Sequence, residues 1–330
     1  MKKFLFLLTG CLFLSCCAQK PATDGLASAN TSTVQNSVSS TPVFNQDSAY
    51  TFVERQVQFG PRVPNTPAHK SCAQYLTSEL ARFGAQTYVQ EAVLTAYNGD
   101  RLQASNIIGV FNPEQKKRVL LFAHWDSRPY SDQDADPNNH RKPIDGADDG
   151  ASGVGVLLEI ARQIGIHGIN IGVDIIFFDA EDYGVPAFLN DNTQDSWCLG
   201  SQFWAKNPHV PNYKAEYGVL LDMVGSKGAT FYKENYSVRY AAPYVENLWN
   251  TARNLGYGKF FINAAGGEVI DDHVYVHKGR GIPGIDIINY SEDSPHRFGS
   301  YWHTQQDTMD NIDRETLKAV GQTLLEVIYK

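Results

Sequence analysis

The 330-residue sequence has no run of lysine or arginine longer than the three residues Lys116-Lys117-Arg118, and its 28 basic residues are outnumbered by 36 acidic ones, which gives a formal net charge of −8. Such a chain is a poor partner for nucleic acid, which binds mainly through cationic side chains. The apolar stretch at residues 4–14 is too short to span a bilayer, which takes roughly 20 residues. The sequence also lacks an internal repeat of about 20–50 residues, which argues against a repeat architecture.

The start of the chain has the pattern of a signal peptide over residues 1–17. Two lysines precede the apolar stretch, and Ser15 follows it. The step from Ser15 to Cys16 resembles the lipobox of bacterial lipoproteins, in which the cysteine is acylated, and Cys17 is a rival acceptor. Simple secretion with cleavage near Ala18 is the alternative. We therefore expect an exported, periplasmic protein of the bacterial cell envelope that contacts the membrane only through a lipid anchor on Cys16 or Cys17.

Cysteine is scarce, and it constrains the folded domain little. Three of the five cysteines fall in or beside the signal peptide, so only Cys72 and Cys198 remain in the mature protein. An oxidising compartment would allow these two to pair, but their separation in sequence does not show whether their Cα atoms come close enough. We favour two buried thiols that pack as small apolar groups.

The chain divides into a polar segment and one folded domain. Residues 18–46 are rich in small and polar residues and are predicted to form a flexible tether, ahead of a catalytic domain over 47–330. Apolar spacing predicts helices from near residue 47 and over 67–83, 151–163, 199–206, 238–255 and after Asp313, and strands over 85–94, 104–111, 119–123, 173–178, 218–222 and 284–289. This alternation predicts a single α/β domain with a central, mostly parallel twisted sheet flanked by helices on both faces.

Acidic residues and one histidine follow separate apolar runs of this domain. They are Asp149, Glu181, Asp182, Asp222, Asp271 and His303. In open α/β sheets, ligands bind beyond the carboxyl ends of the strands. Acids and a histidine gathered at that edge indicate a metal site with a proton-transfer group beside it, so the sequence predicts a metalloenzyme.

The predicted metal site consists of Asp149, Asp182 and His303. Two carboxylates and one imidazole suit a catalytic zinc, which keeps one position open for water or substrate. Glu181 adjoins Asp182, and neighbouring side chains point in different directions, so Glu181 can face the substrate. Like charges raise the pKa of a carboxyl group, which suits Glu181 to move a proton near neutral pH. Asp222 and Asp271 could share that proton in a hydrogen-bonded network.

Each of these residues has a plainer interpretation. Asp149 precedes a helix and could cap it, and His303 could simply donate to a carbonyl. His273 could support a ligand or could be a polar residue in a turn. Trp302 could belong to the core, or could wall a substrate pocket beside the metal-bound histidine. The joint occurrence of so many acids at successive strand ends favours the functional interpretation.

Six motifs in this chain resemble, in content and order, those of the zinc aminopeptidase and glutaminyl cyclase superfamily. They are His124-Trp125-Asp126-Ser127, Gly146-Ala147-Asp148-Asp149, Phe178-Asp179-Ala180-Glu181-Asp182, Leu221-Asp222, Asp271-Asp272-His273 and Trp302-His303-Thr304. The segment Phe59-Gly60-Pro61-Arg62-Val63-Pro64 looks like the amino-terminal signature of the same group. The similarity covers nearly all of 47–330 and implies a zinc aminopeptidase-like fold.

Within that superfamily the chain looks most like a bacterial member of the animal-type glutaminyl cyclases, the glutaminyl-peptide cyclotransferases. Matching features are Gly281-Ile282-Pro283, Trp302, Gln194-Asp195-Ser196 and Gly200-Ser201. The resemblance implies an acyltransferase that converts the N-terminal glutamine of peptides or proteins to pyroglutamate and releases ammonia. It also implies one zinc on Asp149, Asp182 and His303, with Glu181 as general base and then acid, Asp222 and Asp271 in support, and Trp302 with Glu181 at the substrate. We expect a monomer.

The chain departs from the animal pattern at three places. Asp182 stands where animal enzymes have glutamate, and Asp286 lies near a position where they have histidine. Their tryptophan in the loop after the acid pair has no clear counterpart, and either Phe188 or Trp197 could replace it. The contacts to substrate are therefore open.

Two rival functions remain. In a two-zinc aminopeptidase, His124 and Asp222 would complete a second metal site, with Asp149 as the bridging ligand. Asp126 and His273 are then outer partners of the ligands or candidates for the second site. A surface-anchored binding module with an inactive site is the other rival, and the intact acids at every motif argue against it.

Overall fold

The structure, a computed structural model, describes residues 41–191, 193–291, 294 and 296–330. The predicted signal peptide and most of the predicted tether lie outside these residues. The fold begins slightly before the predicted boundary at residue 47, because Phe44 is buried beside Gly321 and the first helix starts at Gln46. The last residues of the predicted tether therefore belong to the folded domain.

Seven helices and eight strands make up the described part of the chain. The helices are α1 (Gln46–Val57), α2 (Pro67–Arg82), α3 (Ala151–His167), α4 (Leu199–Lys206), α5 (Asn235–Asn254), α6 (Asp272–Arg280) and α7 (Arg314–Tyr329). The strands are β1 (Gln86–Thr95), β2 (Arg101–Phe111), β3 (Arg118–His124), β4 (Gly172–Phe178), β5 (Gly218–Asp222), β6 (Phe231–Lys233), β7 (Phe261–Ala265) and β8 (Gly284–Ile288).

The sequence predicted every element except β6, β7 and α6. The two strands are short, and α6 is polar along most of its nine residues. Their sequences therefore lack the regular spacing of apolar residues that indicates a strand or a helix. Asp313 caps α7 as predicted, because its side chain accepts from Thr316 N. Cys72 and Cys198 are buried free thiols, as favoured.

Six strands form one sheet in the order β1-β2-β4-β3-β5-β8. Strands β4, β3, β5 and β8 run parallel to one another, whereas β1 pairs antiparallel with β2, and β2 antiparallel with β4. Strands β6 and β7 form a separate parallel pair. The prediction of a single α/β domain with a mostly parallel sheet is confirmed.

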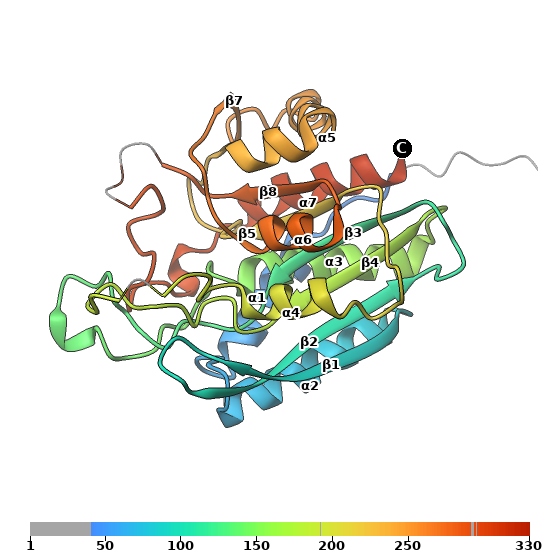
Figure 1. Ribbon diagram of the computed structural model, residues 1–330. Helices are drawn as coiled ribbons and strands as arrows, with labels where there is room; N and C mark the ends of the chain where they lie inside the picture. The colour runs from blue at the N-terminus through green and yellow to red at the C-terminus, as the bar shows by residue number, and fades with distance from the viewer. Residues whose placement is uncertain (1–40, 192, 292–293, 295) are drawn as a thin grey trace, which may run out of the picture. The chain divides into compact units, whose positions relative to one another are not determined.

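Helices cover both faces of the sheet, as Figure 1 shows. Side chains alternate along each strand, so β3 contributes to two cores. Leu120 and Phe122 point to one face and pack with Trp204 of α4 and Val276 of α6. Leu121 points to the other face, where the larger core includes residues of α1, α2, α3, α5 and α7. In the described part of the chain, none of the helices has the length and hydropathy that a membrane span requires.

The three central parallel strands end at the same edge of the sheet. His124 is the last residue of β3, Asp222 is the last residue of β5, and β4 ends three residues before Glu181. Helix α3 packs behind β3 and β5, and a Cβ atom added at Gly153 would lie 2.2 Å from the carbonyl oxygen of Leu221. This close approach brings the residues just before α3 to the ends of both strands.

We predict that Gly153→Ala destabilises the fold. In a helix interior alanine is normally favoured over glycine by about 1 kcal/mol, but here the added methyl group overlaps a backbone carbonyl, and overpacking of this kind costs about 1–3 kcal/mol. Urea denaturation should show a lower free energy of unfolding. Gly258→Ala is the matched control, because the nearest atom to its new Cβ is 3.7 Å away. A Gly153→Ala protein at least as stable as the parent would contradict the close approach.

Candidate metal centre and active site

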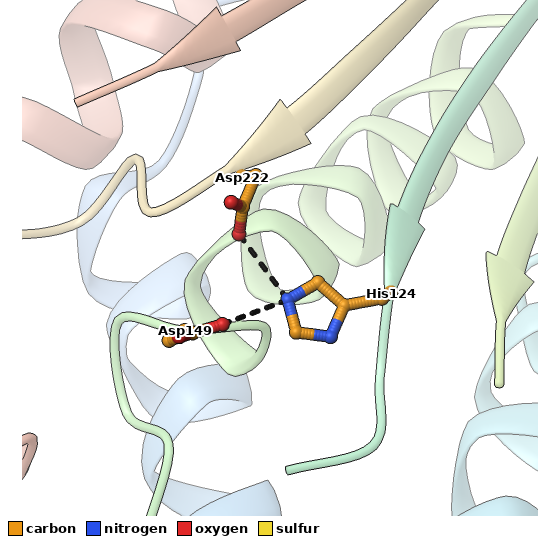
Figure 2. A group of neighbouring side chains, drawn as sticks. All are labelled: His124, Asp149 and Asp222. Atoms are coloured by element: carbon orange, nitrogen blue, oxygen red, sulfur yellow. Dashed lines mark hydrogen bonds and ion pairs between the residues drawn. The ribbon is translucent and has the colours of Figure 1, made fainter. Parts of the chain in front are cut away.

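His124, Asp149 and Asp222 form a compact group, the His124 cluster, at the ends of β3 and β5 (Figure 2). The Nε2 atom of His124 lies 3.0 Å from an Asp149 oxygen and 3.2 Å from an Asp222 oxygen. Asp149 enters the group from the loop before α3. A Cβ atom added at Gly150 would lie 2.6 Å from the His124 ring, so glycine is needed there.

Asp149, Asp182 and His303 form a second group, the His303 cluster, whose candidate ligand atoms all lie within 4.8 Å of one another. The Nε2 atom of His303 is 3.5 Å from Asp149 Oδ2 and 3.3 Å from Asp182 Oδ1. Asp149 belongs to both clusters, since its Oδ1 faces His124 and its Oδ2 faces His303. The structure thus brings together the three residues predicted to bind a metal, although it does not test their role.

The donor atoms of the His303 cluster fit a zinc ion. Two carboxylates and one imidazole are a usual set for a catalytic zinc with an open position. Among the residues that the structure describes, Asp182 Oδ2 is buried and has no hydrogen-bond partner. A buried carboxylate oxygen without a partner is costly unless something satisfies it, and a cation would do so.

The acid pair is held by a tight turn after β4. Ala180 has a φ of 52°, which a non-glycine residue rarely adopts. The carboxylate of Asp126 accepts the backbone N–H groups of Glu181 and Asp182, at 3.1 Å and 3.2 Å. The turn points the two acids in different directions, so that Asp182 joins the His303 cluster while Glu181 faces the cavity.

Glu181 is half-buried and lies beside the buried proton-binding side chains of Cys198 and Asp271. The thiol of Cys198 donates to its Oε1 atom at 3.2 Å and lies 3.9 Å from Asp271 Oδ1. Burial raises the pKa of Glu181 well above its ordinary value, and the nearby charge of Asp271 raises it further. Burial likewise raises the pKa of Asp271, and that of Asp222 to about 8. Asp222 can therefore hold a proton near neutral pH, and the three acids titrate as a group rather than singly.

Nothing in the sequence indicates that Cys198 lies beside Glu181. A single cysteine is most often a small apolar core residue, and that interpretation is right about its burial. Cys198 is held beside the acid pair by its backbone, because its N–H group donates to the backbone oxygen of Glu181 at 2.9 Å. The thiol therefore reaches Glu181 because the backbone returns there before α4.

A cavity of about 720 Å³ opens onto these acids. Trp302 forms part of its wall and stacks on His303 with ring centroids 3.7 Å apart, so it lies where a pocket residue was predicted. Trp197 also lines the cavity, at 5.9 Å from the His303 ring and nearly parallel to it, whereas Phe188 packs on Tyr130. A larger groove between α2 and the β1–β2 hairpin contains none of the predicted acids, so we assign the site to the smaller cavity.

Several residues that the sequence predicts for the site lie in a different kind of secondary structure from the one expected. Asp149, Asp271 and His303 do not follow strand ends, because they lie in loops: Asp271 caps α6 by accepting from Asp272 N, and His303 has a φ of 53°. Asp149 does not cap α3, since the cap position is Gly150. His273 lies within α6, not in a turn, and its Nε2 is 3.2 Å from Glu234, away from both clusters.

Comparison with known proteins gives the family. Residues 106–328 match peptidase family M28, and the chain belongs to this family. A glutaminyl cyclase from Tannerella forsythia is 70% identical, with a TM-score of 0.87, over 88% of this chain and 99% of that one. A Zn-dependent exopeptidase from Parabacteroides distasonis is also 70% identical, with a TM-score of 0.88, over 88% and 100%. Glutaminyl-peptide cyclotransferase from Bos taurus is 27% identical over 80% of this chain and 76% of its own.

We predict that Asp126→Asn loosens the acid-pair turn. The amide group of asparagine would face one backbone N–H with a donor in place of an acceptor, and a hydrogen bond to a charged group contributes about 1.5–3 kcal/mol. Hydrogen exchange should then be about 10–100-fold faster at the amides of Glu181 and Asp182. Asp136→Asn, which alters a similar bond to Asn138 N in an exposed loop, is the control and should leave them unchanged. Unaltered exchange at these two amides in Asp126→Asn would show that their hydrogen bonds to Asp126 do not hold the turn.

Proposed function

We propose that this protein is a glutaminyl-peptide cyclotransferase that converts N-terminal glutamine to pyroglutamate with release of ammonia. The observation that carries the proposal is Glu181, a carboxyl group with a raised pKa, beside a zinc-type donor set at the base of a tryptophan-walled cavity. The similarity to a glutaminyl cyclase over most of the chain supports it.

The chemistry needs one proton to move between two nitrogen atoms of the same residue. Zinc bound in the His303 cluster would polarise the γ-carbonyl of the glutamine side chain. Glu181 accepts a proton from the α-amine as that nitrogen attacks the carboxamide carbon (Cδ) of the glutamine side chain, and then donates it to the departing amide nitrogen as the bond from Cδ to that nitrogen breaks, so that ammonia leaves. Asp271 and Asp222 lie in the same network and can share the proton while it is held.

The cavity has to orient the substrate more than to activate it. Because the attack is intramolecular, the main barrier is to bring the amine and the carbonyl into a reacting geometry. The rings of Trp302 and Trp197, which both stack with the His303 ring and line the cavity, offer flat apolar walls for the glutamine side chain. Glu181 is only partly buried by the protein, so an N-terminal residue can reach it from the cavity.

A two-zinc exopeptidase is the second candidate, and the His124 cluster favours it. His124, Asp149 and Asp222 supply one imidazole and two carboxylates, the same donor types as the His303 cluster, and Asp149 could bridge two ions. Glu181 would then activate water instead of the substrate amine. The similarity to a Zn-dependent exopeptidase supports this candidate in the same way.

Location and assembly are proposed from the sequence alone. We propose export to the periplasm on a signal peptide over residues 1–17, with a lipid anchor on Cys16 or Cys17 as the only membrane contact. The partners would be peptides or proteins that begin with glutamine, and the protein would act as a monomer. These proposals concern segments and contacts beyond the described residues.

We predict that the purified protein releases ammonia from a peptide that begins with glutamine and leaves the pyroglutamyl peptide. The same peptide with leucine or alanine in first place should stay intact. Mass spectrometry of the peptides and a metal count on the same sample answer both questions, with one zinc per chain expected. Release of free amino acid, together with two zinc ions per chain, would establish the exopeptidase instead.

We predict that Glu181→Gln keeps zinc but loses at least about a hundredfold in cyclisation rate, because the amide cannot accept the proton. Zinc content and kcat measured on the same preparation separate the two effects. Glu268→Gln is the matched control, since Glu268 lines the mouth of the same cavity and pairs with exposed Arg239. Near-normal turnover in Glu181→Gln would remove its role as the proton carrier.

A further inference from the structure

Arg128 is a fully buried arginine beside the site, and neither the motifs nor the mechanism above uses it. It follows β3 in the long polar loop, and its side chain has no exposed surface. Its guanidinium group binds Asp132 through two parallel hydrogen bonds, each 2.7 Å long. An arginine side chain has five N–H donors, and a buried charged group is costly unless its donors have partners. The contacts of the donors that do not bind Asp132 are therefore informative.

The remaining donor group of Arg128 binds a metal-ligand residue. Its Nη1 atom lies 3.1 Å from the backbone oxygen of Asp182 and 3.3 Å from Oδ1 of the same residue. These contacts fix both the main chain and the carboxylate of Asp182. They also leave Asp182 Oδ2 as the oxygen without a partner among the described residues.

Through Asp132, Arg128 also acts on the histidine of the same cluster. Asp132 Oδ1 lies 3.5 Å from His303 Nδ1, and Asp132 Oδ2 accepts from Ala187 N at 2.7 Å. A carboxylate behind a histidine fixes which ring nitrogen carries the hydrogen and how the ring is turned. His303 Nδ1 is buried and makes no hydrogen bond among the described residues, so the contact with Asp132 is one of charge; a hydrogen on Nδ1 would face that charge and leave the Nε2 lone pair toward the cluster.

The flat face of the guanidinium group contacts the cavity wall. Its central carbon lies 4.4 Å from the centroid of Trp197, the cavity-lining indole that stands nearly parallel to the His303 ring. Cation–π contacts of this kind hold an indole in one orientation. The Arg128 side chain therefore contacts Asp182 of the His303 cluster, the Asp132 carboxylate next to His303, and Trp197 in the cavity wall.

We propose that Arg128 is a positioning residue that sets the geometry of the His303 cluster and of the Trp197 wall together. The proposal rests on the proposed function in assigning that cluster to zinc and that wall to substrate. Lysine cannot replace arginine here, because an ammonium group cannot bind both oxygens of Asp132, reach Asp182 and stack on an indole at once. Loss of such an outer partner typically weakens metal binding or activity by about 10–100-fold.

The plainer alternative is that Arg128 is a buried ion pair that only stabilises the fold. Arg118 offers a matched comparison, because it also binds a buried carboxylate through two donors, to Asp174 at 2.6 Å and 3.0 Å. It lies at the first residue of β3, at the opposite end of the strand from His124. A purely structural role predicts the same behaviour for Arg128→Lys and Arg118→Lys.

The test measures zinc affinity, unfolding temperature without zinc, and kinetics with a glutamine peptide. Arg128→Lys should bind zinc about 10–100-fold more weakly by chelator competition and should raise KM even at saturating zinc. Arg118→Lys should lower the unfolding temperature and leave zinc affinity within about twofold. Equal zinc affinity in Arg128→Lys and the parent, or equal losses in both lysine variants, would overturn the proposal.

A second variant covers failure of Arg128→Lys to fold. Asp132→Asn keeps the shape of the side chain but removes the charge that faces His303, and it should weaken zinc binding in the same direction. An Asp132→Asn protein with parental zinc affinity would also overturn the proposal. The zinc measurements need no turnover, so absence of cyclase activity in the parent would refute the proposed function without deciding the role of Arg128.

Discussion

The first turn of α3 lies so close to the ends of β3 and β5 that only glycine fits at two of its positions. A Cβ atom at Gly150 would overlap the His124 ring, and one at Gly153 would overlap the carbonyl of Leu221. This approach sets Asp149 between the two histidines, with one oxygen toward each. Asp149 is the residue that the two clusters share, so its position sets the geometry of both.

The same site contains a concentration of backbone strain. Ala180, Cys198, Met223 and His303 all have φ values between 49° and 57°, where L-residues other than glycine are disfavoured. Each costs of order 1 kcal/mol and persists only where its surroundings leave no alternative. At Ala180 those surroundings are visible, because Asp126 binds the next two N–H groups. The fold thus gives up some stability to turn the side chains of successive loops toward one point.

The sequence predicts the strands and the site residues that depend on a local apolar pattern. It does not predict the contacts that depend on the path of a loop through space. Apolar runs located β3, β4 and β5, and the rule that ligands bind beyond parallel strands placed Asp222 and the acid pair correctly. His303 could be named only from its motif, since nothing local shows that a turn with positive φ returns it to Asp149. Arg128 was hidden for a similar reason: a buried arginine in a long polar loop has the composition of an exposed one. Trp197 and Phe188 were equal candidates in sequence, and only the stacking on His303 separates them.

The number of bound metal ions and the supply of protons are linked through Asp222. Burial raises its pKa to about 8, so Asp222 can hold a proton near neutral pH, and burial raises the pKa values of Glu181 and Asp271 in the same direction. In the proposed cyclisation this group would hold the proton that passes from the amine to the leaving group. A second ion in the His124 cluster would require an ionised Asp222 and would expel a proton from the network. Under the two proposed functions, the same side chains would serve acid–base cyclisation if the His124 cluster holds protons, and hydrolysis by activated water if that cluster holds a second metal ion.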